Sequence, residues 1–567
     1  MTILFLNCRL IDGSGGPSSV KSVVVDPPKI RAIVDFPALS QNEQAQLVEA
    51  SDRIVDCESR YVVAPGFIDM HAHSDLGVLH TPSHLAKITQ GVTTEVLGQD
   101  GIGYAPVNDE CLAHIRQQIQ GWNGNPSDPS FWAWRSVKEY LDHLDKSQIA
   151  TNAAFLVPQG NLRMLVLGYD PREPTKAEIA KMQDILRQSL REGAVGMSSG
   201  LTYVPGMYAS DSELAQLLPI VAEHGGYYCP HHRSYGKGAL RAYQEMIDLA
   251  KLTGIRLHLT HAILNFEENK NSAPQFLEML KRGRENGVTI TLDSYPYLPG
   301  STTLAAQLPS WSAEGGPEQT LVNLQTPEVL EKIRYGVEVI GTDGCHGCTV
   351  DWSTIEISGI SNPELKPYVG KRIAEIAELE SVSGFDAMIK ILIADRLATT
   401  ILQHVGHEEN VRAIMQDKFH SGGSDSILTS AKPHPRGHGC FTRYLGHYAR
   451  ELPQGKQRDI YTPTSDLEKY DSVPPYTVFE GGLEEAVAHL TGRSAAILQL
   501  ADRGLVKPGY YADLVVFDPH TVRDTATFMR PEVYSSGIRS VLVNGEFAVD
   551  ESEPTHARTG RTIRSVH

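Results

Sequence analysis

The sequence predicts an α/β protein: a TIM-type (β/α)8 barrel with a small β-sandwich domain formed by the N- and C-terminal segments. Three observations lead to this fold class. Eight strand-like apolar segments alternate with helix-like segments in the middle of the chain, histidines and aspartates follow several of these strands, and short strands broken by turns occupy both ends. At 567 residues the chain is too long for one ordinary core, so a large barrel with a smaller domain suits its length.

Both ends of the chain are rich in short strands and turns. Near the N-terminus, strands are predicted at 3–7, 22–25 and 30–34. Near the C-terminus, strands are predicted at 512–518 and 538–543, and the Asn544-Gly545 pair that follows is typical of a tight hairpin. We therefore expect residues 1–62 to form the first part of the β-sandwich, and residues 501–567 to form its second part and a C-terminal tail.

Residues 63–500 are predicted to form the barrel. The strand candidates are 63–70, 93–97, 153–157, 194–197, 226–229, 255–259, 288–292 and 419–423, and helical stretches such as 176–192, 211–223 and 274–286 separate several of them. The gap between the seventh and eighth strands is too long for a single helix. We therefore expect an insertion at about 298–418 that partly covers the site.

Composition and charge limit the class of partner. The chain carries 51 Lys and Arg against 68 Asp and Glu, a net charge of −17, which opposes binding to nucleic acid or to an anionic membrane. No apolar run is long enough for a membrane span, and the N-terminus lacks the basic start of a signal peptide. Seven thinly spread cysteines are typical of reduced thiols. We expect a cytoplasmic protein with a small-molecule substrate, and the oligomeric state stays open.

The first predicted barrel strand ends in a pair of histidines. His71 and His73 are two residues apart, so on a strand their side chains point to the same side. Two imidazoles on one side of a strand end can bind one metal ion. The pair follows a buried strand near the start of a long α/β chain, and this context favours a metal site.

Four further polar residues follow other strands of the predicted barrel, where the chemistry of such barrels lies. They are Asp100, His231, His261 and Asp425. We predict a metal site of His71, His73, Asp100, His231 and His261; nitrogen and carboxylate ligands suit Zn²⁺ best, with Fe, Mn and Co as alternatives. Asp425 is predicted to be catalytic: it can accept a proton from a water whose pKa the metal lowers to ~7, and later protonate a leaving amine. The pattern indicates a metal-dependent hydrolase.

Neighbouring histidines are assigned by strand phase. His231 and His232 are adjacent and point to opposite sides, so we favour His231 as the ligand and a structural role for His232. His258 has the opposite phase to His261 and is expected to pack among helices.

Three motifs could have a role other than a functional site. Asp425, in a Gly-Gly-Ser-Asp turn, could cap a helix, and Asp100 lies in a glycine-rich turn where Asp is common. Cys345 and Cys348 have CxxC spacing but no second pair at a suitable distance. A structural zinc site is therefore not expected there.

These residues lie within runs that resemble the D-aminoacylases (N-acyl-D-amino-acid deacylases) of the amidohydrolase superfamily. The resemblance covers nearly the whole chain. Its markers are PGFIDMHAH at 65–73, GVTT at 91–94, GAVGMSSGLTY at 193–203, YPYLPGST at 295–302, GSD at 423–425, HPR at 434–436, GCFTRYLG at 439–446, GLV at 504–506, GYYADLVVFDP at 509–519 and VNG at 543–545. Each run alone is moderately specific, and their order along the chain makes the family assignment strong.

The resemblance implies a zinc enzyme that hydrolyses the amide of an N-acylated D-amino acid. By position, His231 and His261 would bind the essential zinc, and His71 and His73 would flank a second, weaker metal position. Asp425 would be the general acid and base. Tyr295, Ser301 and Arg436 match positions that hold the substrate carboxylate, and an Arg suits that task because its fork can pair bidentately with a carboxylate.

Three departures from the family pattern leave the substrate open. Where D-aminoacylases carry a metal-binding cysteine in a Gly-Asn-Cys-Gly run, this chain has Asp100 in Gly-Gln-Asp-Gly. Ile263 replaces a lysine that helps to bind carboxylate, and 158–161 (PQGN) replaces a Gly-His-Gly run. The leading hypothesis is a deacylase of N-acyl-D-amino acids. The alternatives are a related amidohydrolase acting on a cyclic amide, dipeptide or specialised amide, and a catalytically inactive barrel with a binding role.

Overall fold

The centre of the molecule is a parallel barrel. The structure, a computed structural model, describes residues 1–458, 460, 470–472 and 474–565. Eight strands follow one another in a single sheet, every adjacent pair parallel: β6 (Phe67–Asp69), β7 (Val92–Leu97), β8 (Asn152–Pro158), β9 (Gly196–Gly200), β10 (Tyr227–His231), β11 (Arg256–Leu259), β12 (Ile290–Ser294) and β16 (His420–Gly422). The amide of Met70 donates to the carbonyl of Gly422 (3.1 Å), which joins the two edge strands. The predicted TIM-type barrel is confirmed, and each predicted strand overlaps an observed one.

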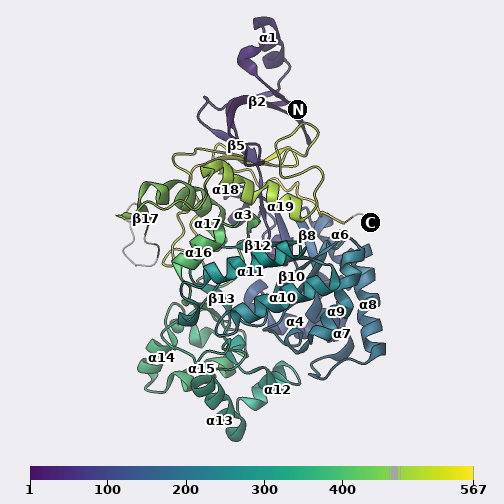
Figure 1. Cartoon of the computed structure of the whole chain (residues 1–567), viewed down its shortest axis with the longest axis vertical. Helices are drawn as coiled ribbons and strands as arrows, with labels where there is room; N and C mark the ends of the chain where they lie inside the picture. The colour runs from purple at the N-terminus through teal and green to yellow at the C-terminus, as the bar shows by residue number, and fades with distance from the viewer. Residues whose placement is uncertain (459, 461–469, 473, 566–567) are drawn as a thin grey trace.

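Amphipathic helices cover the outside of the barrel. The helices α8 (Lys176–Arg191), α9 (Asp211–Glu223), α10 (Ala239–Thr253) and α11 (Ala273–Glu285) pack side by side in chain order (Figure 1). α8 shows why such a segment is helical. Thr175 and Glu178 form a capping box at its start, and Ile179, Met182 and Leu186 recur on one buried face. Burial of that face against the barrel holds the helix in place.

One apolar run that the sequence assigned to a single barrel strand forms two strands. The prediction of one strand at 63–70 was wrong, because the chain passes from one sheet to another at Gly66. β5 (Val62–Pro65) pairs with the terminal sheet, and β6 pairs with β7. A Cβ at Gly66 would lie 2.3 Å from the side chain of Thr93, so the close approach there requires glycine.

The two ends of the chain build one nine-stranded sheet. Its strands are β1 (Ile3–Leu10), β2 (Ser19–Asp26), β3 (Lys29–Val34), β4 (Arg53–Asp56), β5, β19 (Leu514–Phe517), β20 (Ile538–Val543), β21 (Glu546–Asp550) and β22 (Glu553–Pro554). β5 and β19 pair antiparallel and join the ends. Asn544 and Gly545 have φ of +52° and +85° and make the hairpin between β20 and β21. Residues 566 and 567 of the predicted tail lie outside the described residues.

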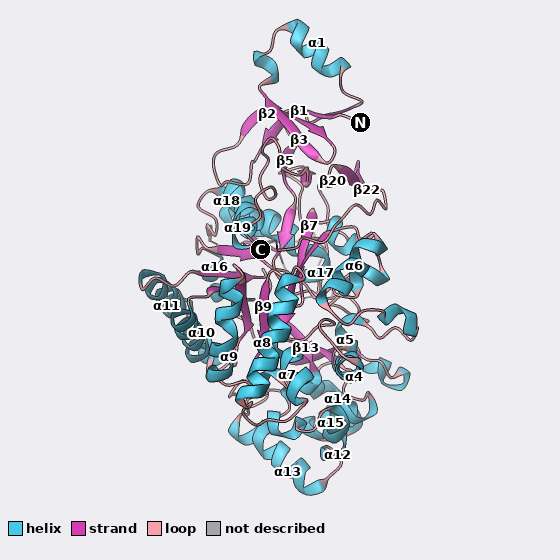
Figure 2. Ribbon diagram, turned by 90° about the vertical axis from the view of Figure 1, so that its right-hand side faces the viewer, coloured by secondary structure: helices cyan, strands magenta, loops and turns pink. Residues whose placement is uncertain are grey.

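The insertion after the seventh barrel strand has a core of its own. It contains the antiparallel strands β13 (Gly300–Thr303), β14 (Ile355–Gly359) and β15 (Thr400–Gln403), and the helices α12 (Pro317–Asn323), α13 (Pro327–Tyr335), α14 (Ile373–Glu380) and α15 (Gly384–Ala394). Leu304, Ile357 and Phe385 are among its buried apolar residues. The insertion and the nine-stranded sheet lie at opposite ends of the molecule, with the barrel between them (Figures 1 and 2).

At the end of the insertion, α16 (Glu408–Met415) packs against α11 and returns the chain to the barrel. Within the described part of the chain, no helix combines the length and the apolar character that crossing a membrane requires.

Candidate metal centre

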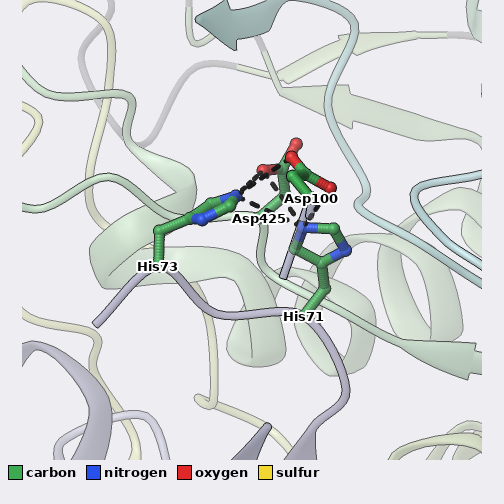
Figure 3. A group of neighbouring side chains, drawn as sticks. All are labelled: His71, His73, Asp100 and Asp425. Carbon is green, nitrogen blue, oxygen red and sulfur yellow. Dashed lines mark hydrogen bonds and ion pairs between the residues drawn. The ribbon is translucent and has the colours of Figure 1, made fainter. Parts of the chain in front are cut away.

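The six polar residues predicted at strand ends lie together at one end of the barrel. They form two overlapping groups: His71, His73, Asp100 and Asp425 in one (Figure 3), and Asp100, His231 and His261 in the other. All six side chains are buried. Within each group the nitrogen and oxygen atoms that can bind a metal are within 4.8 Å of one another.

Asp100 belongs to both groups. Its Oδ1 lies 3.5 Å from His71 Nε2 and 3.4 Å from His261 Nε2. Its Oδ2 lies 3.4 Å from His73 Nε2 and 3.4 Å from His231 Nδ1. Two ligand atoms that share one tetrahedral zinc at ~2.1 Å are separated by ~3.4 Å. These separations would suit Asp100 as a metal ligand in either group, and its Oδ1 has no hydrogen-bond partner among the described residues.

The loop after β7 places this carboxylate. Asp100 has φ of +56°, and Gly98 and Gly101 on either side also have positive φ. A Cβ at Gly200 would lie 2.0 Å from the carbonyl oxygen of Asp100, so the loop and β9 approach closely only because that residue is glycine. Asp100 is thus both a turn residue and a member of the cluster.

Each histidine of the second group has one ring nitrogen toward the centre of the cluster and the other against a hydroxyl group. His231 Nδ1 faces the centre and its Nε2 lies 2.7 Å from Thr202 Oγ1. His261 Nε2 faces the centre and its Nδ1 lies 3.2 Å from the hydroxyl of Tyr235. Outer contacts of this kind fix ring orientation and tautomer, as they do behind metal-binding histidines.

The buried carboxylates of the cluster affect the protonation of the histidines beside them. Burial lowers the pKa of His71 to about 4, which keeps that ring neutral and able to bind a metal. Burial also opposes the charged form of His73, but hydrogen bonds to Asp100 and Asp425 outweigh it and raise the pKa of His73 to about 10. The two buried carboxylates thus favour a positive charge beside them. A divalent ion would supply that charge, so the residues suit a metal.

Asp425 follows β16 and faces the first group. Its backbone amide donates to the carbonyl of His71 (2.8 Å), and its Oδ1 lies 3.2 Å from His73 Nε2. Its Oδ2 lies 3.0 Å from Arg436 Nη2. Burial alone would raise the pKa of Asp425, but Arg436 and the neighbouring histidines outweigh it and hold that pKa below its ordinary value. The carboxylate is ionised and can accept a proton.

The helix-cap alternative for Asp425 is wrong. The next helix is α17, which begins eleven residues later (Arg436–Arg443), with Pro435 at its N-cap position.

Two neighbouring histidines lie outside the cluster. His232 packs its ring on Tyr243 and Tyr235, with centroid distances of 4.0 and 4.1 Å. The expectation that His258 packs among helices was wrong: its Nε2 lies 2.9 Å from Asp293 Oδ2, on the neighbouring strand β12. Strict alternation does not extend from His258 to His261, because β11 ends at Leu259 and His261 has φ of +28°.

A buried ionic network under the site was not found from the sequence. Lys87 has no exposed surface, and its Nζ donates to Asp69 Oδ2 (2.6 Å), Ser424 Oγ (2.7 Å) and Ser426 Oγ (2.6 Å). Ser424 and Ser426 flank Asp425, so Lys87 holds the turn that presents this carboxylate. Lysines are mostly exposed in proteins, and nothing in the sequence around Lys87 marks it as an exception.

A cavity opens over the cluster. Its lining includes the following residues: His73, Asp100, Trp122, Tyr203, His231, His261, Ile263, Phe266, Tyr295, Ser301, Gln307, His346, Gln403 and Asp425. Of the residues predicted to hold a carboxylate, Tyr295 and Ser301 line this cavity. Arg436 is fully buried beside Asp425, with its guanidinium 4.4 Å from the ring centre of Tyr295. Ile263 occupies the position of the family's lysine and lines the cavity.

Comparisons with known proteins identify the family of this chain and several relatives. A family model described as "Amidohydrolase family" matches residues 53–549. An N-acyl-D-glutamate deacylase of Alcaligenes xylosoxydans xylosoxydans is 32% identical over 98% of this chain and 95% of its own length. A D-aminoacylase of the same organism is 30% identical over 99% and 97%. Among solved structures, the N-acyl-D-glutamate deacylase from Bordetella bronchiseptica, complexed with zinc and a phosphonate inhibitor, is 30% identical, with a TM-score of 0.77 over 99% of both chains.

Proposed function

Because the chain belongs to the amidohydrolase family and hydrolyses an amide C–N bond, we propose that it is a zinc-dependent deacylase of N-acyl-D-amino acids. The observation that carries the proposal is the buried cluster of His71, His73, Asp100, His231, His261 and Asp425. The substrate class rests on relatives that are an N-acyl-D-glutamate deacylase and a D-aminoacylase.

Zinc is supported by the donor set and by its spacing. Three imidazole or carboxylate ligands with one open position are typical of catalytic zinc. Asp100, His231 and His261 form such a set and would hold one tight zinc. His71 and His73, with Asp100 between the two groups, would hold a second ion more weakly. A related solved structure also contains zinc.

Asp425 would move the proton of the reaction. When bound, zinc polarises the substrate carbonyl and lowers the pKa of the attacking water. Asp425 accepts the proton from that water as it adds to the amide carbonyl. The same carboxyl then gives the proton to the departing amine nitrogen as the C–N bond breaks, which releases a carboxylic acid and a free amino acid. Arg436 fixes the orientation of Asp425 through their ion pair.

Tyr295, Ser301 and Arg436 would hold the substrate carboxylate. Tyr295 and Ser301 line the cavity, and none of the guanidinium nitrogens of Arg436 makes a well-aligned hydrogen bond to the described residues. A substrate carboxylate next to Tyr295 would meet the guanidinium donors that Asp425 does not occupy.

A second candidate, hydrolysis of a cyclic amide, a dipeptide or another specialised amide, is favoured by two observations. Ile263 removes one cation from the pocket, and Arg436 is already paired with Asp425. An inactive barrel with a binding role is disfavoured by the family and by the complete set of six clustered residues.

We also assign the enzyme to the cytoplasm with a small-molecule substrate. All seven cysteines lie in the described part of the chain as free, buried thiols, which supports a reducing compartment.

Turnover of matched substrates tests the proposed function. The zinc-loaded protein should hydrolyse N-acetyl-D-methionine and leave N-acetyl-L-methionine and the uncharged N-acetyl-D-methioninamide nearly untouched. If instead it prefers a cyclic amide or the uncharged analogue, the second candidate replaces the first.

A further inference from the structure

Two polar side chains of the insertion line the cavity, and each has one buried atom without a hydrogen-bond partner among the described residues. Gln307 is 1% exposed and lines the cavity, and its Oε1 has no hydrogen-bond partner among the described residues. His346 lines the same cavity, and its buried Nδ1 is also unpartnered within the described part of the chain. Buried polar atoms are nearly always paired in folded proteins, so two such atoms on residues that line one cavity point to a ligand that pairs with them.

The backbone carbonyl of each residue accepts a hydrogen bond that helps to fix its position. The thiol of Cys345 donates to the carbonyl of Gln307 (3.3 Å), and the hydroxyl of Ser234 donates to the carbonyl of His346 (3.1 Å). The ring of His346 lies near the rings of Tyr235 and Phe266, at centroid distances of 5.6 and 5.8 Å. The CxxC run around His346 therefore positions two cavity residues.

The wall formed by these residues is neutral. Burial lowers the pKa of His346 to about 3, so its ring carries no charge at physiological pH. Among the described residues that line the cavity there is no lysine or arginine, and the carboxylates present are Asp100 and Asp425. A second carboxylate on the substrate would meet acids and no cation here. A carboxamide or hydroxyl can both donate and accept hydrogen bonds, which matches an amide and a neutral imidazole.

We propose that Gln307 and His346 form a recognition subsite for a neutral hydrogen-bonding group, a carboxamide or hydroxyl, on the variable part of an N-acyl amino acid. The enzyme selects such substrates over those with a second carboxylate. This inference rests on the proposed deacylase function and specifies its substrate class. The group is carried either by the amino-acid side chain or by the acyl group.

Two substrate series locate the group. The first compares N-acetyl-D-glutamine, N-acetyl-D-glutamate and N-acetyl-D-methionine with the zinc-loaded enzyme. The second keeps D-leucine and compares succinamoyl, succinyl and butyryl as the acyl group. We expect kcat/KM for the carboxamide to exceed that of both analogues by about tenfold or more in one series, which identifies the part of the substrate bound.

Matched variants separate recognition from folding. Gln307→Met and His346→Leu should each lower kcat/KM for the preferred carboxamide by about tenfold and change the alkyl analogue by less than about twofold. Gln319→Met is the control, because Gln319 is exposed on α12 in the same insertion and does not line the cavity. It should behave like the wild type with every substrate.

The results distinguish the two levels of the account. Equal kcat/KM for carboxamide, carboxylate and alkyl substrates in both series, or a preference for the carboxylate or alkyl substrate, would overturn the subsite and leave the deacylase function standing. No hydrolysis of any N-acyl-D-amino acid would refute the deacylase function, and the subsite would fall with it.

Discussion

The two walls of the cavity differ in charge and in how their residues are held. The barrel wall presents His and Asp side chains that contact one another, with Lys87 behind the turn of Asp425. The insertion wall presents Gln307 and His346, which are neutral and each have one buried atom without a hydrogen-bond partner in the described part of the chain. A network of mutually supporting contacts can hold a reacting geometry. A wall carried on a separate core can vary without disturbing that geometry. Under the proposed function, the barrel wall carries out the chemistry and the insertion wall contributes to the choice of substrate.

The largest effect is expected at the proton-transfer residue. Asp425→Asn keeps the shape of the side chain but removes the base, so kcat should fall by ~10²–10⁴-fold. Zinc content measured by elemental analysis should remain at the wild-type level. Turnover near that of the wild type would mean that the barrel wall does not perform the chemistry through this carboxylate.

A change beneath the barrel wall should destabilise the protein. Lys87→Met leaves Asp69 buried without its cation, and removing one partner of a buried pair costs ~3–5 kcal/mol. Urea titration measures the loss. Lys281→Met is the control. Lys281 lies on α11 with a largely exposed side chain, where it forms a long ion pair with Glu278 (4.0 Å), so its replacement should change the free energy of unfolding by less than ~0.5 kcal/mol. Equal urea midpoints for the two variants would mean that Lys87 does not stabilise the barrel wall.

Variants of Asp100 test its proposed role as a metal ligand. Asp100→Ala removes the carboxylate that faces all four histidines, so zinc affinity should fall by more than the ~10–100-fold typical of losing an outer contact. Asp100→Cys should recover binding, because a thiolate is a good zinc ligand. Competition with a chelator measures both. An unchanged affinity in the alanine variant would reduce Asp100 to a turn residue.

Arg436 should have a smaller and substrate-dependent effect. Arg436→Met should lower kcat/KM for an N-acyl-D-amino acid ~10–100-fold, as expected for a lost charged hydrogen bond. Because Arg436 also pairs with Asp425, part of the loss will be common to all substrates. The ratio of kcat/KM between the acid and its amide analogue isolates carboxylate binding, and that ratio should shrink. An unchanged ratio would mean that Arg436 orients Asp425 and does not bind the substrate carboxylate.

The barrel wall was more predictable from the sequence than the insertion wall. Each of its cluster residues lies at the end of an apolar strand, and strand ends of a parallel barrel meet at one rim. The exceptions depend on local geometry: the chain changes sheets at Gly66, and the turn after Leu259 breaks the phase of His258.

The remaining features depend on tertiary packing. Lys87 becomes a site residue only because its helix, α3 (Leu85–Ile88), brings its Nζ to Ser424 and Ser426 beside Asp425. Gln307 and His346 reach the cavity from an insertion in which no periodic pattern specifies where a side chain will point. The sequence therefore indicated that an insertion exists, but not which of its residues face the substrate.

Zinc titration of the metal-free enzyme tests the central claim most directly. The initial rate of N-acetyl-D-methionine hydrolysis is measured while zinc is added to chelator-treated protein. The account predicts no turnover before zinc is added. The initial rate should then reach its maximum at about one zinc per chain, bound by Asp100, His231 and His261. Full activity in protein that elemental analysis shows to be free of transition metals would contradict it.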